Sequence, residues 1–200
     1  VILVGDDPAS QIYVRKKREA CAKIGIISKS YFLPEKTSEQ TLLALVKKLN
    51  KDKKVHAILA QLPLPKHISE QKIIEAIQPE KDVDGLHPMN IGRFMMHKYL
   101  SDSTTLLPCT PYGVIRLLQA YAIPIKGKNV VILGRSNLVG KPLGMLFLAE
   151  NATVTFCHSK TKDLKNITKQ ADIVASAVGL PKFIDASYIK KGTVVIDVGF

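Results

Sequence analysis

The sequence has few of the residues that build metal sites, disulfide frameworks and membrane spans. Its 200 residues include three cysteines, Cys21, Cys109 and Cys157, and contain no CxxC or HExxH motif. An odd number of widely separated cysteines argues against a disulfide framework and indicates a reducing, cytoplasmic location. No apolar run approaches the roughly 18 residues of a membrane helix, and the chain opens with no signal-peptide pattern. We therefore expect no metal and no membrane partner.

Acidic residues are also scarce relative to basic ones. There are 17 Asp and Glu against 29 Lys and Arg, which gives a net charge of +12. Such an excess favours anionic partners, such as nucleic acid, phosphorylated cofactors or polycarboxylate substrates. Composition does not choose among them, but the chain has no stripe of alternating aromatic and basic residues to support nucleic-acid binding. The hydrophobic content of 46% is typical of a globular protein.

Apolar runs alternate with helical patterns, and the alternation restarts halfway along the chain. Strands are expected over 1–5, 26–33, 55–65, 129–134, 152–158, 171–179 and 192–199, and helices over 10–25, 38–50, 69–77, 138–149 and a stretch ending near Tyr121. A polar, proline-bearing segment, 101–113, is typical of a domain junction. The predicted fold class is α/β, with two α/β units over 1–108 and 109–200, the second Rossmann-like.

Four consecutive basic residues, 15–18, lie in the first predicted helix, for which Asp7 is the expected N-cap. At roughly 100° per residue, Lys17 falls on an apolar stripe rather than on the outer face. The stripe consists of Ser10, Tyr13, Lys17, Ala20, Cys21 and Ile24. A lysine on such a face is costly unless it is paired or lines a cleft. The alternative is a lysine that extends along a helix–sheet margin to reach water.

Further polar residues of the first unit follow strands and turns. Gln61 ends the strand expected over 55–65, just before "LPLP", and ligands of open α/β sheets bind outside the carboxyl ends of strands. Asp82 and Asp84 lie in a turn with glycine and proline, where either can form the turn, pair with Lys17 or bind a heterocycle. A lysine, a tyrosine, a glutamine and an aspartate form a set suited to proton transfer and substrate anchoring.

The second unit contains a strand–glycine–helix turn, "VVILGRSNLVGKPLG". This is the context in which a turn holds a pyrophosphate at a helix N-terminus. The spacing departs from G-x-G-x-x-G, because Ser136 replaces the second glycine and one extra residue precedes Gly140. Turns of this kind that bind nothing are common, so the motif alone is weak.

The end of the following strand favours NADP over NAD. An NAD site holds the ribose hydroxyl with an acidic residue there, whereas this strand ends His158-Ser159-Lys160-Thr161. Together with Arg135 on the turn, a cation and hydroxyls suit a 2′-phosphate. The alternative is that His158 and Lys160 are ordinary loop residues.

Seven motifs together resemble the bifunctional methylenetetrahydrofolate dehydrogenase/cyclohydrolase family. In chain order they are "VGDDPASQIYVRKK", "QLPLP", "PEKDVDGLHPMNIG", "PCTPYGVIRLL", "GRSNLVGKPLG", "TVTFCHSKT" and "VVIDVG". The resemblance implies NADP-dependent oxidation of 5,10-methylene-tetrahydrofolate to the 5,10-methenyl form and hydrolysis of that product to 10-formyl-tetrahydrofolate. It implies a folate-binding catalytic domain over 1–108, an NADP-binding domain over 109–200, one shared site in an interdomain cleft, and a homodimer without nucleic acid.

The resemblance also implies roles for individual residues. Lys17 is the catalytic lysine, Gln61 supports it, Tyr13 packs against the folate and Asp84 holds the pterin. Substrate contacts extend to Leu62 and Pro63. The NADP-binding positions are Thr110 in an interdomain loop, Gly134, Arg135, Ser136, His158, Ser159, Val178, Gly179, Val198 and Phe200.

Departures from the family pattern lie at the two ends. About three dozen initial residues and the PGGVGPMT loop have no counterpart, and Phe200 stands where the family usually has isoleucine. A chain that starts and stops at strands is expected to be a piece of a longer protein. Two other classes remain open: a different NADP-dependent dehydrogenase with a lysine acid/base, such as the shikimate type, and a basic nucleic-acid-binding module.

Overall fold

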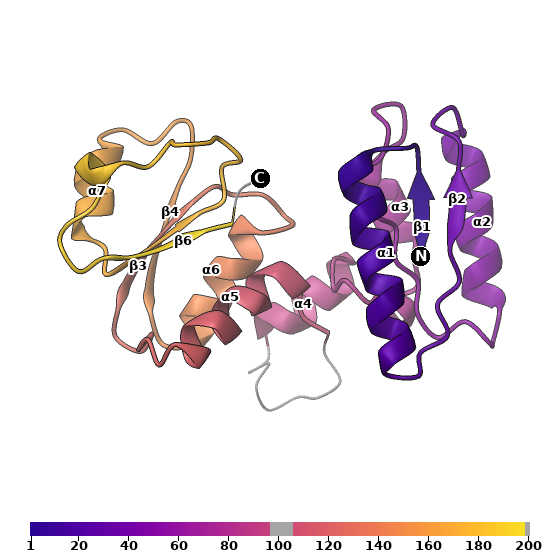
Figure 1. Ribbon diagram of the computed structural model, residues 1–200, viewed down its shortest axis with the longest axis horizontal. Coiled ribbons are helices and arrows are strands. Elements are labelled where there is room, and N and C mark those ends of the chain that lie inside the picture. The colour runs from indigo at the N-terminus through magenta and orange to yellow at the C-terminus, as the bar shows by residue number, and fades with distance from the viewer. Residues whose placement is uncertain (97–105, 199–200) are drawn as a thin grey trace. The chain divides into compact units, whose positions relative to one another are not determined.

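The computed structural model describes residues 1–96 and 106–198, which divide into two compact units, Val1–Asn90 and Ile91–Phe200 (Figure 1). Each unit has its own buried core, and each is described by itself. The predicted α/β class is confirmed, because parallel strands alternate with helices in both. The predicted interdomain cleft stays a prediction.

Unit 1 contains a short parallel pair of strands with helices around it. Its elements are β1 (Ile2–Val4), α1 (Pro8–Lys23), β2 (Tyr31–Leu33), α2 (Glu39–Lys51), α3 (Glu70–Ala76), the 3-10 turn η1 (Pro79–Lys81) and the start of α4 (Pro88–Met96). The predicted N-cap of α1 is confirmed, because Asp7 accepts from the Ser10 N–H, and Ser38 caps α2. Helix α1 packs beside β1 (Figure 1). Helix α2 packs beside α3.

The strand expected over 55–65 is not a regular strand. The segment lies parallel to β1 but forms only isolated bridges, Ile2 with Ala60 and Ile58 with Asp82. Its backbone still pairs with β1, because the Gln61 N–H donates to the Ile2 carbonyl at 2.8 Å. The prolines that follow end the pairing, since proline lacks an N–H and restricts the residue before it. The predicted strand over 26–33 likewise shortens to β2.

The predicted buried stripe of α1 is partly wrong. The least exposed line of the helix runs through Ser10, Val14, Lys17 and Cys21, whereas Ala20 and Ile24 face solvent and Tyr13 is 39% exposed. The helix rests on β1 along this narrow line, and the described residues of unit 1 do not cover the rest of the predicted stripe. Lys17 itself is half-buried, as expected for the only one of the four consecutive cations on that face.

Unit 2 is a four-stranded parallel sheet with the order β4-β3-β5-β6 among the described residues. Its elements are the rest of α4, α5 (Cys109–Ala120), β3 (Asn129–Leu133), α6 (Gly140–Ala149), β4 (Thr153–Cys157), α7 (Leu164–Gln170), β5 (Ile173–Ser176), the 3-10 turn η2 (Ala186–Tyr188) and β6 (Val194–Asp197). Buried aliphatic strands pair with amphipathic helices, as the sequence predicts. The chain leaves β3 for β4 on one side and returns to β5 on the other.

Two features around the predicted junction differ from expectation. Helix α4 was not expected, because its first residues are rich in proline and glycine; Pro88 nevertheless suits the first turn of a helix. The expected junction at 101–113 lies partly outside the described residues, and its last five residues are helical. Thr110 therefore lies in the first turn of α5 rather than in a loop, since Pro108 and Pro111 are tolerated at a helix start.

Candidate functional site

Lys17 and Gln61 are brought together in unit 1. The Lys17 Nζ donates to the Gln61 Oε1 at 3.1 Å, across 44 positions of sequence. The amide is held from its other end, because its Nε2 donates to the Leu62 carbonyl at 2.8 Å. The side-chain amide of Gln61 is therefore oriented with its oxygen toward the lysine. The half-buried ammonium of Lys17 is held by this hydrogen bond rather than extending freely into solvent. This contact fits the support of Lys17 by Gln61 that the resemblance implies.

The two aspartates of the turn have different environments. Asp82 is buried, and its Oδ2 accepts from the His87 N–H at 2.8 Å and from the Asn90 Nδ2 at 2.9 Å. Asp82 is thus the residue that closes the turn. Burial raises the pKa of Asp84, the positive charge of Lys17 lowers it, and the negative charge of Asp82 raises it. The pKa of Asp84 thus responds to the charge of Lys17 as well as to burial.

The other predicted substrate residues of unit 1 lie on α1, near Lys17, and directly after Gln61 in the chain. Tyr13 lies one turn before Lys17 on α1. Leu62 is half-buried against the core, and Pro63 is exposed. The segment is held by Glu70 of α3, whose carboxylate accepts the Leu64 N–H at 3.1 Å. Sequence reasoning missed Glu70, and only its position at the start of a predicted helix could have indicated a contact of this kind.

The glycine turn of unit 2 is closely packed against the start of α6. Gly134 has φ +116°, and a Cβ there would lie 2.6 Å from the Ala177 carbonyl oxygen. A Cβ on Gly140 would overlap the Gly134 carbonyl. Only glycine fits either position, which brings the ends of β3 and β5 together at the start of a helix. That is the arrangement in which open α/β sheets bind nucleotides.

Ser136 takes the place of the second glycine and has a defined local role. Its Oγ accepts the N–H groups of Val139 at 3.1 Å and Gly140 at 3.2 Å. The serine thus occupies amides at the N-terminus of α6, which the usual glycine motif leaves open. Its neighbour Arg135 is exposed. The departure from G-x-G-x-x-G is therefore accommodated by a side chain that caps the helix.

Most of the remaining residues predicted to bind the cofactor follow the carboxyl ends of parallel strands. His158 and Ser159 follow β4, Val178 and Gly179 follow β5, and Val198 follows β6, so all lie at the edge of the sheet that carries Gly134. The loop after β4 is closed on itself, because the His158 N–H donates to the Thr161 Oγ1 at 2.8 Å and the His158 Nδ1 accepts the Lys160 N–H at 3.1 Å. Phe200 lies outside the described residues.

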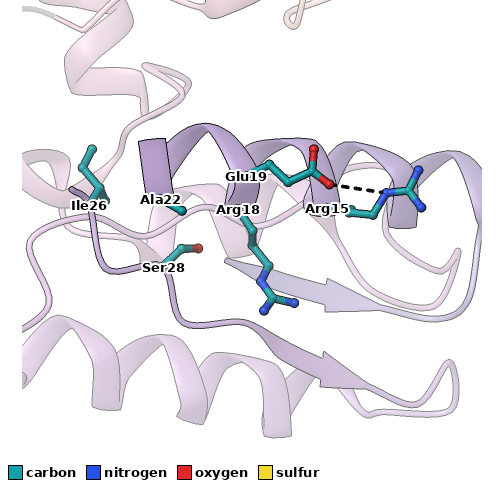
Figure 2. A pocket seen from close by; sticks show the side chains of 6 residues that line it. All are labelled: Arg15, Arg18, Glu19, Ala22, Ile26 and Ser28. Atoms are coloured by element: carbon teal, nitrogen blue, oxygen red, sulfur yellow. Dashed lines mark ion pairs between the residues drawn. The ribbon is translucent and has the colours of Figure 1, made fainter. Parts of the chain in front are cut away.

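A hollow of about 430 Å³ lies elsewhere in unit 1, along another side of α1 (Figure 2). It is lined by Arg15, Arg18, Glu19, Ala22, Ile26 and Ser28. The Arg15 Nε lies 3.9 Å from the Glu19 Oε1, in an exposed pair that contributes little stability. Lys17 is not among the lining residues, and we assign this hollow no part in the site.

Over the described ranges, 1–96 and 106–198, no helix is long and apolar enough to cross a membrane. The same residues contain no cluster of three or more His, Cys, Asp or Glu side chains that could hold a metal ion. The parallel sheet with its glycine turn, joined in one chain to a second α/β unit bearing a lysine–amide pair, defines the class of α/β enzymes with a nucleotide-binding unit.

Comparison with known families identifies the chain within this class. The family model for the "Tetrahydrofolate dehydrogenase/cyclohydrolase, catalytic domain" matches residues 1–84, and that for the "NAD(P)-binding domain" of the same family matches 108–200. The chain belongs to the tetrahydrofolate dehydrogenase/cyclohydrolase family. It is 58% identical over 199 residues to the "Bifunctional protein FolD" of Halalkalibacterium halodurans, an alignment that covers 100% of this chain and 70% of that protein. The predicted resemblance is confirmed.

Solved structures agree with the family assignment. The bifunctional FolD enzyme of Campylobacter jejuni matches with a TM-score of 0.90 and 48% identity, covering 99% of this chain and 69% of that one. The Trypanosoma brucei enzyme, solved with NADP cofactor and an inhibitor, matches with a TM-score of 0.91 and 40% identity, over 99% and 66% of the two chains. Shikimate dehydrogenase of Peptoclostridium difficile shares only the fold, at 14% identity and a TM-score of 0.56 over 100% and 76%.

Proposed function

We propose that this chain catalyses the NADP-dependent oxidation of 5,10-methylene-tetrahydrofolate and the hydrolysis of the resulting 5,10-methenyl form to 10-formyl-tetrahydrofolate. The first reaction removes a hydride from the methylene carbon, and the second adds water to that carbon, opens its bond to N5 and releases a proton. Both reactions change the same carbon, so one set of unit 1 residues can serve both. The observation that carries the proposal is the contact between Lys17 Nζ and Gln61 Oε1 at 3.1 Å.

In this proposal Lys17 moves the proton of the hydrolytic step. Its amine is pinned at the end of the 55–65 segment, where the Gln61 oxygen accepts one of its three N–H donors. The remaining donors are available to a water or to the folate nitrogen. Gln61 orients the lysine, because its own amide is fixed by the Leu62 carbonyl.

Asp84 anchors the pterin in the same proposal. A carboxylate that has lost water regains hydrogen bonds from donors on a ligand, such as the ring N–H and amino group of a pterin. The pKa of Asp84 is raised chiefly by burial, which is the environment expected of such an anchor. Tyr13 offers a ring for the folate to pack against, and Leu62 and Pro63 complete the apolar contacts.

The carboxyl edge of the unit 2 sheet fits a dinucleotide. The absence of a Cβ lets Gly134 pack on the Ala177 carbonyl and Gly140 on the Gly134 carbonyl, which gives the tight strand–helix turn at which open α/β sheets bind a pyrophosphate. Arg135 and Ser159 would bind the 2′-phosphate, with Ser136 and His158 beside them. Thr110, Val178, Gly179, Val198 and Phe200 are the remaining proposed contacts. NADP, when bound, supplies the hydride acceptor.

A pair of lysine variants in the complete enzyme tests the proposal. Lys17→Met should lower cyclohydrolase activity by about 10²–10⁴-fold while NADP still binds, because the proton-transfer group is lost. Lys16→Met is the matched control, since Lys16 is the exposed neighbour on the same helix and should retain near-normal rates. Wild-type hydrolysis by Lys17→Met would exclude the proposed role.

We also propose a cytoplasmic homodimer that acts in one-carbon metabolism and supplies formyl groups for purine biosynthesis. The three cysteines lie in the described part of the chain and form no disulfide, which supports a reducing compartment. Cell fractionation tests the location, and light scattering coupled to gel filtration tests the dimer. The division into a folate domain over 1–108 and an NADP domain over 109–200 is proposed with it, and separate expression of the two pieces would test it.

A further inference from the structure

We infer that Asp82 is a positioning residue for the folate site: its buried carboxylate fastens the turn that carries Asp84, through Asn90 and the His87 backbone. The inference rests on the proposed function, because it assigns Asp82 a role only if Asp84 binds the pterin. It goes beyond the substrate residues that the resemblance implies, which are Tyr13, Gln61, Leu62, Pro63 and Asp84.

Three hydrogen bonds connect the two ends of the turn to each other and to the start of α4. The Asp82 Oδ2 accepts the His87 N–H at 2.8 Å, which joins the two ends of the turn, and accepts the Asn90 Nδ2 at 2.9 Å from the start of α4. The same Asn90 Nδ2 donates to the Pro79 carbonyl at 2.8 Å, just before the turn. Asp82 and Asn90 are 4% and 9% exposed, so water does not compete for these bonds.

The beginning of the turn is fixed by separate contacts. The Ile58 N–H donates to the Lys81 carbonyl at 2.7 Å, which ties the turn to the segment that ends in Gln61. The Lys81 Nζ donates to three carbonyls at the end of α2, those of Leu49, Asn50 and Asp52, at 3.0, 2.7 and 2.9 Å. The start of the turn is therefore held by Lys81, and its far end is tied to Asp82 through His87 and Asn90, with Asp84 between the two ends. The sequence left open which of Asp82 and Asp84 forms the turn, and it did not predict the contacts of Lys81 and Asn90.

The charge of Asp82 adds a second effect on the same group. Its carboxylate raises the pKa of Asp84, in the direction opposite to the effect of Lys17. Substitution of Asp82 can therefore act through position or through charge, and the two are separable. Asp82→Asn keeps an oxygen that accepts both hydrogen bonds and removes the charge, whereas Asp82→Ala removes both.

The test is steady-state kinetics of the complete enzyme with 5,10-methylene-tetrahydrofolate and NADP. Asp82→Ala should raise the KM for the folate by about tenfold or more with a smaller change in kcat, because a misplaced anchor weakens substrate binding. The single variant Asp82→Asn should have a KM for the folate within about threefold of wild type, because it keeps the oxygen that accepts both hydrogen bonds. Asn90→Ala should raise it in the same direction, and the double variant with Asp82→Ala should add little, since the two side chains share one bond.

Ser38→Ala is the matched structural control. Ser38 also makes side-chain hydrogen bonds in unit 1, because its Oγ accepts the Thr41 N–H at 3.1 Å and lies 2.8 Å from the Thr41 Oγ1. Its loss should lower the unfolding temperature and leave the folate KM unchanged, since it caps the start of α2 and makes no contact with the turn. Should Asp82→Ala fail to fold, Asn90→Ala with Asp82→Asn decides the question by the same KM comparison.

Asp84→Ala separates the inference from the proposed function. If it raises the folate KM while Asp82→Ala and Asn90→Ala leave it unchanged, the inference is overturned and the proposed function stands. If Asp84→Ala itself leaves the folate KM unchanged, the proposed anchor fails and the role of Asp82 fails with it. A KM raised equally by Ser38→Ala would also overturn the inference, because it would show a general effect of lost hydrogen bonds.

Discussion

Asp84 stabilises the folded state less when it is charged than when it is protonated. Its pKa is raised above the ordinary value of 3.8, chiefly by burial. The ionised form of this carboxylate therefore carries a free-energy penalty in the folded state, because it has lost water. As the pH falls, the folded state takes up the proton before the unfolded state does, and the penalty disappears below the unfolded pKa. We expect Asp84→Asn to unfold at a higher temperature than wild type at pH 7, with the difference vanishing at about pH 3, below the unfolded value.

Asp172→Asn is a control of the opposite sign. The Asn129 N–H and Lys190 lower the pKa of Asp172, so its ionised form is favoured by folding at neutral pH. This variant should unfold at a lower temperature than wild type at pH 7, and the difference should shrink in acid. Thermal unfolding followed by circular dichroism at both pH values measures both variants. An Asp84→Asn protein less stable than wild type at pH 7 would contradict the first expectation.

Arg135 is the residue that we expect to distinguish the two nicotinamide cofactors. Arg135→Ala should weaken NADP binding by about tenfold or more and change NAD binding much less, because NAD lacks the phosphate that the guanidinium would bind. Calorimetric titration with each cofactor measures the two affinities. Lys141→Ala is the control, since the Lys141 Nζ is engaged by the Asn137 Oδ1 at 2.7 Å. Equal losses for both cofactors in Arg135→Ala would assign the arginine to the turn or the pyrophosphate.

At the scale of elements, the turn between β3 and α6 depends on two glycines. A Cβ at position 140 would overlap the Gly134 carbonyl, so Gly140→Ala should displace the turn and sharply reduce NADP affinity. Gly113→Ala is the contrasting variant, because a Cβ at Gly113, inside α5, meets nothing within 4 Å. That change should preserve NADP binding and stabilise the protein by about 0.5–1 kcal/mol. Fluorescence titration and thermal unfolding check both. Undiminished NADP binding by Gly140→Ala would show that cofactor binding does not depend on the tight packing of this turn.

Most elements of this fold could be predicted from short-range signals. Asp7 and Ser38 mark the starts of α1 and α2 by hydrogen bonds that the residue types imply, and the β-branched runs of unit 2 become β3, β5 and β6. Signals of this kind act within a few residues. The elements that they predict therefore form largely independently of contacts elsewhere in the chain.

The remainder depends on contacts that a linear pattern does not contain. Helix α4 begins with residues that include proline and glycine, which do not predict a helix. It is stabilised by the Asp82–Asn90 hydrogen bond and by the burial of Phe94, and neither contact can be read from local sequence. The buried line of α1 differs from the predicted stripe, because burial depends on which element covers the helix and not only on the spacing of apolar residues. The Lys17–Gln61 contact could be anticipated from the family resemblance, whereas the three carbonyls held by Lys81 could not.

At the scale of the whole molecule, the dehydrogenase and cyclohydrolase activities are proposed to depend on the same unit 1 residues. The two reactions act on one carbon of the folate. Lys17 and Gln61 are in contact within Val1–Asn90, and the charge of Lys17 lowers the pKa of Asp84 in the same unit. A single substrate site requires that a folate analogue competing for Asp84 exclude both substrates. Two sites would bind the analogue with two affinities, since each would surround it with different side chains.

We therefore expect one inhibition constant for both activities of the complete enzyme. The analogue should inhibit the oxidation of methylene-tetrahydrofolate and the hydrolysis of methenyl-tetrahydrofolate with the same constant, when both assays are run at matched NADP saturation. Asp84→Ala should weaken both constants by the same factor, because the free energy lost is that of one contact. Parallel spectrophotometric assays measure the constants. An analogue that blocks one activity and spares the other, or an Asp84→Ala variant that shifts only one constant, would require two separate folate sites.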